Sequence, residues 1–221
     1  MNRSPYLVVS VATTGIFADD YTPKLLEIAA VLVRPGETVR KRPGWFHALV
    51  KQPAEHLRTP QARAAEKFHG ITPEMCAGAF SEEEVRESFT AWRTGLVREL
   101  FERNMVLAGW RAYSRDFVSL VLCDEWVPAM GGFSTAGRCI MEDASEVMGL
   151  HGAVQESWDG GYRYPSLARA ARWLRGRGHG VIGPEAKEGN KGRPIANAAT
   201  AAEVAEALFA ERDLLRERNA S

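Results

Sequence analysis

Short apolar runs separated by polar turns fill the first fifty residues. Residues 6–11 are uncharged and rich in β-branched side chains, and residues 25–33 form a second apolar run. Runs of this length and composition predict buried β-strands. The Thr-Thr-Gly segment at 13–15 turns the chain between them, and residues 45–50 predict a third strand, which ends at Pro53. The pattern therefore predicts a β-hairpin that belongs to a larger sheet.

Farther along, apolar side chains recur every three or four residues, which is the spacing of one helical face. Ser81 and Glu84 form a capping box at the start of a helix predicted to reach about Asn104. Ser166 is the predicted N-cap of another helix. The remaining predicted helices cover Phe117 to about Trp126, Leu167–Arg175 and residues 198 to about 218, and a further helix begins at the acids Glu142 and Asp143 and ends at Leu150.

Composition narrows the class of protein. The chain has 221 residues, 45% of them hydrophobic, which fits one globular domain over residues 1–221. Lys plus Arg and Asp plus Glu number 28 each, so no net field draws the protein toward nucleic acid or membrane. The three cysteines lack metal-ligand spacing, and no run reaches the ~20 apolar residues of a membrane span. We therefore predict a cytoplasmic protein with reduced thiols and no membrane partner.

The first hairpin resembles a known motif. An apolar strand, Asp-x-Glu-Thr-Thr-Gly and a strand with Ile-Glu-Ile-Gly-Ala-Val form the first motif of the DnaQ-like (DEDD) 3′–5′ exonucleases. In this chain Ser10 stands for the Asp and Ala12 for the Glu. The other landmarks of the motif are present as Thr13, Thr14, Gly15 and Glu27.

Three further segments are similar to the same family, in the same order. His69, Gly70, Ile71 and Thr72 match a loop whose Ile-Thr pair lines the pocket of the terminal nucleotide in relatives. Residues 106–118 match the second motif without a gap, with Ser114 in the slot of the catalytic Asp. Residues 192–204 match the closing motif of the histidine subclass (DEDDh), where Gly192 replaces the general-base His and Asn197 the last metal-binding Asp.

This resemblance covers residues 6 to 210 and implies an α/β fold. The expected architecture is RNase H-like, a mixed central sheet flanked by helices. The resemblance also implies a substrate-binding set, which consists of Thr13, Thr14, Gly15, His69, Ile71, Thr72, Trp110 and Arg111.

The chemical positions of the motif all depart from the family pattern. In relatives the carboxylates hold divalent metals, and Mg²⁺ demands hard oxygen ligands in near-octahedral geometry. No catalytic residue is intact, because the degenerate slots are occupied by Ser10, Ala12, Ser114, Gly192 and Asn197. We therefore predict a catalytically degenerate nuclease with no metal and no cofactor. It would bind a single-stranded nucleic-acid 3′ end or a nucleotide, or serve as a regulatory scaffold.

Two alternatives remain open. The first is an active 3′–5′ exonuclease that holds Mg²⁺ or Mn²⁺ through displaced ligands, with His179 as the base. Its candidate ligands are Asp116, Asp19 and Asp20, although Asp116 points about 200° away from position 114 on a helix. The second is a protein-interaction module with a vestigial cleft. A protein partner and a homodimer are further expectations.

A basic segment follows the loop at 151–165. From Arg163 to Arg193 there are eight Lys or Arg against two Glu. Such an excess suits phosphate contacts, and it equally suits a solvated helix face followed by a glycine-rich loop.

Overall fold

The protein is seen here in a computed structural model, which describes residues 5–18, 20–34, 36, 44–100, 105–118, 137–181 and 193–220. Within these residues the strands form one five-stranded sheet in the order β3-β2-β1-β4-β5. The strands are β1 (Tyr6–Thr13), β2 (Leu25–Val33), β3 (Trp45–Leu49), β4 (Val106–Gly109) and β5 (Arg138–Cys139). β2 runs antiparallel to both of its neighbours, β1 and β3, whereas β4 runs parallel to β1 and β5 parallel to β4. The predicted hairpin and third strand are confirmed.

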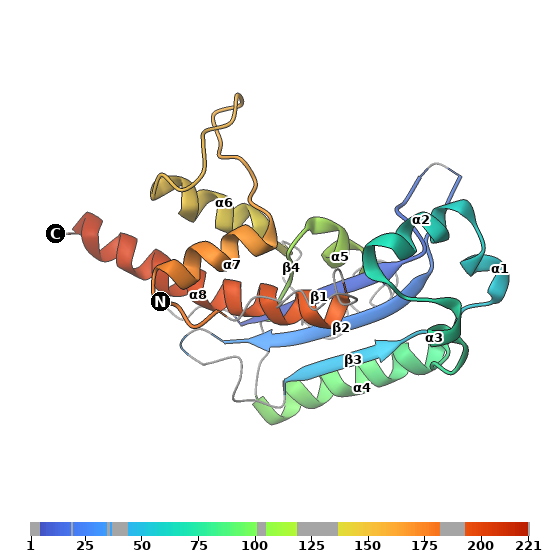
Figure 1. Cartoon of the computed structure of the whole chain (residues 1–221). Helices are drawn as coiled ribbons and strands as arrows, with labels where there is room; N and C mark the ends of the chain where they lie inside the picture. Colours follow the sequence, from blue (N-terminus) through green and yellow to red (C-terminus); the bar gives the residue numbers. More distant parts are fainter. Residues whose placement is uncertain are drawn as a thin grey trace.

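Helices cover both faces of this sheet. They are α1 (Ala54–Leu57), α2 (Pro60–His69), α3 (Pro73–Ala77), α4 (Glu82–Leu100), α5 (Ala112–Phe117), α6 (Ile140–Leu150), α7 (Leu167–Gly176) and α8 (Pro194–Ala220). α6, α7 and α8 gather on one side, and α4 runs along β3 (Figure 1). The described residues include no helix with both the length and the apolar character needed to cross a bilayer.

The alternation of side chains along β1 splits the core into two layers. Tyr6 and Val8 pack with α6, α7 and α8, whereas Leu7 and Val9 pack with Phe89 of α4 and residues of α5. This division follows from the period of two along a strand, which sends successive side chains to opposite faces. The face of β1 that carries Tyr6 and Val8 also carries Ser10 and Ala12.

The helix ends agree with the sequence signals, with two corrections. Ser81 and Glu84 make the reciprocal hydrogen bonds of a capping box, and Ser166 Oγ accepts from Arg169 N. The last helix begins at Pro194, four residues before the predicted start, because proline is well suited to the first helical turn.

The helix after β4 begins earlier than predicted, at Ala112 instead of Phe117. The sharp turn into it depends on Gly109, because a Cβ there would lie 2.9 Å from Arg111 O. Residues 119–136, where that helix was expected to continue, lie outside the described residues.

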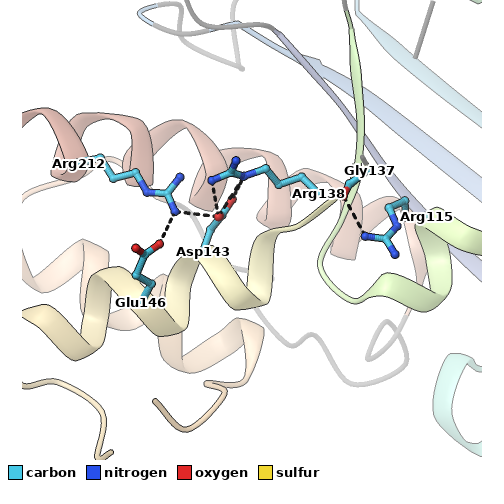
Figure 2. Close-up of polar contacts among 6 residues, drawn as sticks. All are labelled: Arg115, Gly137, Arg138, Asp143, Glu146 and Arg212. Atoms are coloured by element: carbon cyan, nitrogen blue, oxygen red, sulfur yellow. Dashed lines mark hydrogen bonds and ion pairs between the residues drawn. The ribbon is translucent and has the colours of Figure 1, made fainter. Parts of the chain in front are cut away.

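α6 begins with an acidic turn, as predicted. Asp143 accepts hydrogen bonds from Arg138 at the end of the sheet and from Arg212 of α8, and Arg212 also reaches Glu146 (Figure 2). Because the carboxylate is mostly buried, these charge-assisted bonds compensate its desolvation and join α6, β5 and α8. The sheet end and two helices are thereby held in one arrangement.

A second buried acid joins the end of α7 to α8. Glu211 accepts from Arg177 Nε at 2.7 Å and Nη2 at 2.8 Å, and His179 Nε2 lies 2.7 Å from Oε1. His151 Nε2 lies 3.2 Å from Oε2. Burial raises the pKa of the Glu211 carboxyl, but the bonds from Arg177 and His179 outweigh it and lower the pKa to about 2.

We predict an acid-sensitive contribution to stability from Glu211. Since its folded pKa lies below its ordinary value of 4.5, the stabilisation is present above about pH 4.5 and is lost as pH falls toward 2. The loss should be about 2–3 kcal/mol in urea-unfolding free energy, whereas Glu211→Gln should be less stable at neutral pH and show a flatter acid limb. A wild-type and a variant acid limb of equal slope would contradict this assignment.

Candidate functional site

The site lies where β1 and β4 end, at the carboxyl edge of the parallel strands, which is where open α/β sheets bind ligands. The Thr-Thr-Gly turn follows β1 and is held rigidly. Thr14 N donates to Lys24 O at 2.9 Å, and Lys24 N returns a bond to Thr14 Oγ1 at 2.9 Å. Tyr21 OH donates to Thr14 O at 3.0 Å. Thr14 is therefore a structural residue of the turn.

Tyr113 connects this turn to α5. Its hydroxyl donates to Gly15 O at 3.0 Å and lies 2.8 Å from Thr13 Oγ1, which itself lies 2.6 Å from the same carbonyl. Burial raises the pKa of the Tyr113 hydroxyl, so it stays protonated at neutral pH. The contact brings the neighbouring Ser114, which is half-buried, to the end of β1.

Ser10, Ala12 and Glu27 share one face of the sheet. Ala12 pairs with Glu27 across the antiparallel β1–β2 ladder, and Ser10 pairs with Ala29. Directly opposed residues lie on the same face, as do residues two apart on a strand. The Glu27 carboxylate is therefore the cross-strand neighbour of the Ala12 methyl group.

Glu27 is fully buried, at 0% exposure, and its charge is matched by two partners. Arg193, just before α8, donates from Nε to Oε2 at 2.6 Å and from Nη2 to Oε1 at 3.1 Å. His47 of β3 donates from Nε2 to Oε1 at 2.7 Å. These bonds from Arg193 and His47 compensate the desolvation of the buried carboxylate.

Two contacts fix the direction of α8 across the sheet. Arg193 lies at the level of Glu27 and Ala12, and Phe209 packs on Tyr6 at the start of β1 with ring centroids 4.8 Å apart. The helix therefore runs antiparallel to β1. Asn197 lies about 6 Å along the helix from Arg193, and Ser10 about 7 Å along the strand from Ala12. Asn197 is thus level with Ser10.

The segment from His69 to Thr72 closes the site beside β1. Ile71 packs with Ala12, Leu26 and Cys76 in an apolar cluster. His69 is buried, and its Nδ1 accepts from Ile71 N at 3.0 Å, while Nε2 has no well-formed hydrogen bond. Burial lowers the pKa of His69, although the nearby Thr13 backbone and Glu27 act in the opposite direction. A neutral imidazole is the result.

Comparison with known proteins gives one type of match. No family model matches the sequence, and no curated protein matches it significantly. Among solved structures, cell-death related nuclease 4 superposes with a TM-score of 0.65 at 15% identity, over 95% of this chain and 64% of that one. The nuclease domain of 3′hExo, a DEDDh family member bound to rAMP, gives 0.56 at 12% identity over 96% and 92%.

E. coli exonuclease I in complex with an oligonucleotide gives a TM-score of 0.58 at 15% identity, over 98% of this chain and 42% of that one. The chain therefore spans less than two thirds of two of these three proteins. The chain has the fold of the DnaQ-like exonucleases. The expected RNase H-like α/β architecture is confirmed, and at this level of identity the likeness concerns the fold alone.

The residues at the four acid positions of the resemblance lie on neighbouring elements, namely β1, α5 and α8, but their side chains do not suit a metal. Ser10 and Asn197 lie level on facing elements, Ala12 is two residues from Ser10, and Ser114 is held beside the turn by Tyr113. The donors offered are two hydroxyls and one amide, whereas Mg²⁺ prefers carboxylates. Among the described residues, no three His, Cys, Asp or Glu side chains are grouped so as to hold a metal. The residues present therefore do not fit a divalent metal ion.

The predicted substrate-binding residues divide into two groups. The hydroxyls of Thr13 and Thr14 bond within the protein, Ile71 is buried in the apolar cluster, and Thr72 is the N-cap of α3. Gly15 and Trp110 are half-buried, as is Thr72, and Arg111 is exposed. Trp110 packs partly against the core on the α8 side. The first group shapes the site, and the second can contact a ligand.

The displaced-ligand alternative meets several obstacles in the structure. Asp116 is exposed and pairs with Arg115 at 2.6 Å, and Asp20 is exposed. His179 bonds to Glu211, which is fourteen residues beyond Asn197 on α8, or about 21 Å along the helix. Asp19 and Gly192 lie outside the described residues. Asp116 and His179 are thus engaged elsewhere.

No sequence pattern indicates the contacts of Tyr113 and His47, and two residues of the basic segment have other roles. Arg193 was counted with the basic segment, but it is the partner of Glu27, and Arg177 is the partner of Glu211. Lys187 and Lys191 lie outside the described residues, so the exposed basic side chains of that segment are Arg163, Arg169, Arg172 and Arg175.

We predict that the Glu27–Arg193 pair is required for stability. Arg193→Met leaves a buried carboxylate paired only with His47 and should cost about 3–5 kcal/mol of unfolding free energy. The double variant Glu27→Gln/Arg193→Met removes both charges and should recover a substantial part of that loss. Urea unfolding, followed by circular dichroism, measures the two single variants, Glu27→Gln and Arg193→Met, and the double variant. If the double variant loses as much unfolding free energy as the two single variants combined, the two residues are not coupled.

Proposed function

We propose that this protein is a DnaQ-like exonuclease fold that has lost metal-dependent hydrolysis and binds a single-stranded nucleic-acid 3′ end or a nucleotide without cleaving it. The observation that supports the proposal is that all four acid positions of the resemblance carry neutral side chains, on the neighbouring elements β1, α5 and α8. Of these, Ala12 packs in an apolar cluster with Ile71. The adjacent acid, Glu27, is already bonded to Arg193 and His47.

The energetic contributions of the metal and the general base indicate that hydrolysis is lost and not only slowed. A catalytic metal supplies several kcal/mol of transition-state charge stabilisation. At about 1.36 kcal/mol per factor of ten, its loss reduces the rate on the order of a thousandfold or more. A general base would add a further factor of about 10²–10⁴, and the alternative base, His179, is bonded to Glu211.

The side chains at the carboxyl edge of β1 and β4 support the binding of a nucleic-acid end or a nucleotide. Four acid positions without charge leave the edge less repulsive toward phosphate than a carboxylate cluster would be. Arg111 is exposed at the start of α5, directly after the end of β4, and Trp110 presents part of its ring there. Aromatic and guanidinium groups are the usual contacts to unpaired bases and phosphates. Exonuclease I and 3′hExo were solved with an oligonucleotide and rAMP, respectively.

Restoring the acids tests the loss of the metal site. The variant Ser10→Asp/Ala12→Glu/Ser114→Asp/Asn197→Asp should be stabilised by Mn²⁺, by about 2.7 kcal/mol at one hundred times the dissociation constant. Wild-type protein should show no such shift and no Mg²⁺- or Mn²⁺-dependent trimming of labelled DNA or RNA. Thermal unfolding with and without Mn²⁺ is the measurement.

Ala12→Glu enters an apolar cluster and endangers folding, so the triple variant without it is the second arm of the experiment. A control variant with four acids at exposed positions of α2 and α4, namely Arg63, Lys67, Arg86 and Ser88, tests for unspecific Mn²⁺ binding. Mn²⁺-dependent trimming by wild-type protein that Asp116→Ala abolishes would overturn the proposal.

Ligand binding is tested separately with Arg111. Arg111→Glu should weaken binding of a fluorescent dT12 about tenfold at low salt, and the wild-type affinity should fall as salt rises. Arg86→Glu on α4 is the matched charge reversal and should leave the affinity unchanged. Fluorescence anisotropy gives both affinities. The paired variant Arg172→Glu/Arg175→Glu shows whether the strand also reaches α7.

A further inference from the structure

The connection between α6 and α7 is an ordered hairpin that projects from the body of the protein (Figure 1). Glu156 and Tyr162 form an antiparallel bridge. Arg163 N donates to Gln155 O at 2.9 Å, and Ser157 N donates to Gly161 O at 2.7 Å. The chain reverses at Gly160, whose φ of 81° is in the left-handed region that favours glycine. The tip is thus held by its own backbone.

The base of the hairpin is fixed to both neighbouring helices. Ser145 Oγ on α6 donates to Tyr162 O at 2.8 Å, and Arg169 Nη2 on α7 donates to Ala153 O at 2.8 Å. The Tyr162 ring lies directly on Gly149 of α6, where a Cβ would come within 2.2 Å of Tyr162 Cγ. Glycine at this helical position therefore makes room for the ring. The hairpin therefore holds its tip rigidly. A rigid surface loses less conformational entropy when a partner binds.

The tip presents aromatic surface to solvent. Trp158 is 97% exposed, and Tyr164 is 63% exposed. Tryptophan and tyrosine contribute disproportionately to protein–protein binding energy because they bury a large area with few rotatable bonds. A nearly fully exposed tryptophan on a backbone-bonded hairpin contributes nothing visible to the packing of the core.

An open cavity of about 540 Å³ lies between the hairpin and α6, and its lining includes Ser157 and Asp159, the two chain neighbours of Trp158. Its lining includes the acids Glu142, Glu146 and Asp159, the rings of Tyr162 and Tyr164, and one cation, Arg163. Glu146 is already paired with Arg212 at 2.9 Å (Figure 2). Within the described part of the chain, Glu142 and Asp159 take part in no ion pair. The cavity therefore has two tyrosines in its lining and more acids than cations.

We propose that the hairpin and α6 form a docking site for a protein segment that inserts an arginine side chain into this cavity and packs apolar atoms on Trp158. A guanidinium matches the lining because it pairs with carboxylates in a planar fork and stacks on aromatic rings. The cavity volume lies within the range of specific small sites. The excess of acids opposes phosphate, so this surface is distinct from the proposed 3′-end site.

The test uses a capped peptide, Gly-Ser-Leu-Arg-Leu-Ser-Gly, and its counterparts with citrulline or glutamate at the central position. The indole N–H of Trp158, assigned with Trp158→Phe, and the amide of Gly161 are followed by NMR. The arginine peptide should shift both signals saturably. The citrulline peptide should bind about tenfold more weakly, since two partly exposed charge pairs together contribute on the order of that factor.

The double variant Glu142→Gln/Asp159→Asn keeps the shape of the cavity and the oxygen that accepts from Gly161 N. It should bind the arginine peptide about tenfold more weakly, as the wild type binds the citrulline peptide. Glu83→Gln/Glu87→Gln on α4 is the matched control and should bind as wild type does. An absent or non-saturable shift, or equal affinity in the Glu142/Asp159 variant, would overturn the proposal. Shifts of the same signals by dT12 would also overturn it and assign the surface to nucleic acid. None of these outcomes bears on the Arg111 experiment.

Discussion

The buried ion pair between Glu27 and Arg193 fixes the arrangement on which the site depends. It joins the middle strand of the antiparallel part of the sheet to the first residue before α8, 166 positions away in the chain. A fully buried carboxylate is tolerated only with such compensation. Because the far end of α8 packs on Tyr6, the pair and the Tyr6–Phe209 contact together set the direction of the helix over β1. Asn197 reaches the level of Ser10 for this reason.

Other contacts hold the rest of the site. The turn after β1 is held by Tyr21 and Tyr113, and Ala12 has apolar neighbours where a carboxylate would need a cation. Hydroxyls, apolar side chains and one paired acid, Glu27, thus stand beside the positions where relatives carry carboxylates. The geometry of a nuclease fold is thus compatible with a function in binding, which must be argued from the site and not from the scaffold.

The molecule presents two surfaces of opposite character. The carboxyl edge of β1 and β4 has neutral walls with Arg111 beside it, whereas the hairpin and α6 expose Trp158 next to a cavity with more acids than cations. The overall balance of 28 basic and 28 acidic residues hides this separation. A protein that holds a nucleic-acid end on one surface and a basic protein segment on another would act as an adaptor, and the two experiments test the two surfaces independently.

The sequence alone determined the first three strands, several helices and the order of these elements. Short continuous apolar runs placed β1, β2 and β3, the capping residues Ser81 and Ser166 placed two helices, and the four matched segments specified the fold. The positions that lack the acids of the family, such as Ser10 and Asn197, could also be predicted from the sequence, because they sit at fixed offsets within local patterns.

Only the tertiary structure decided which polar groups are already bonded to a partner within the protein. Partnerships such as Arg193 with Glu27, or Glu211 with His179, join residues far apart in the chain, and no local periodicity encodes them. The sequence could not show that Gly149 makes room for Tyr162, since that contact depends on how a hairpin folds back onto a helix.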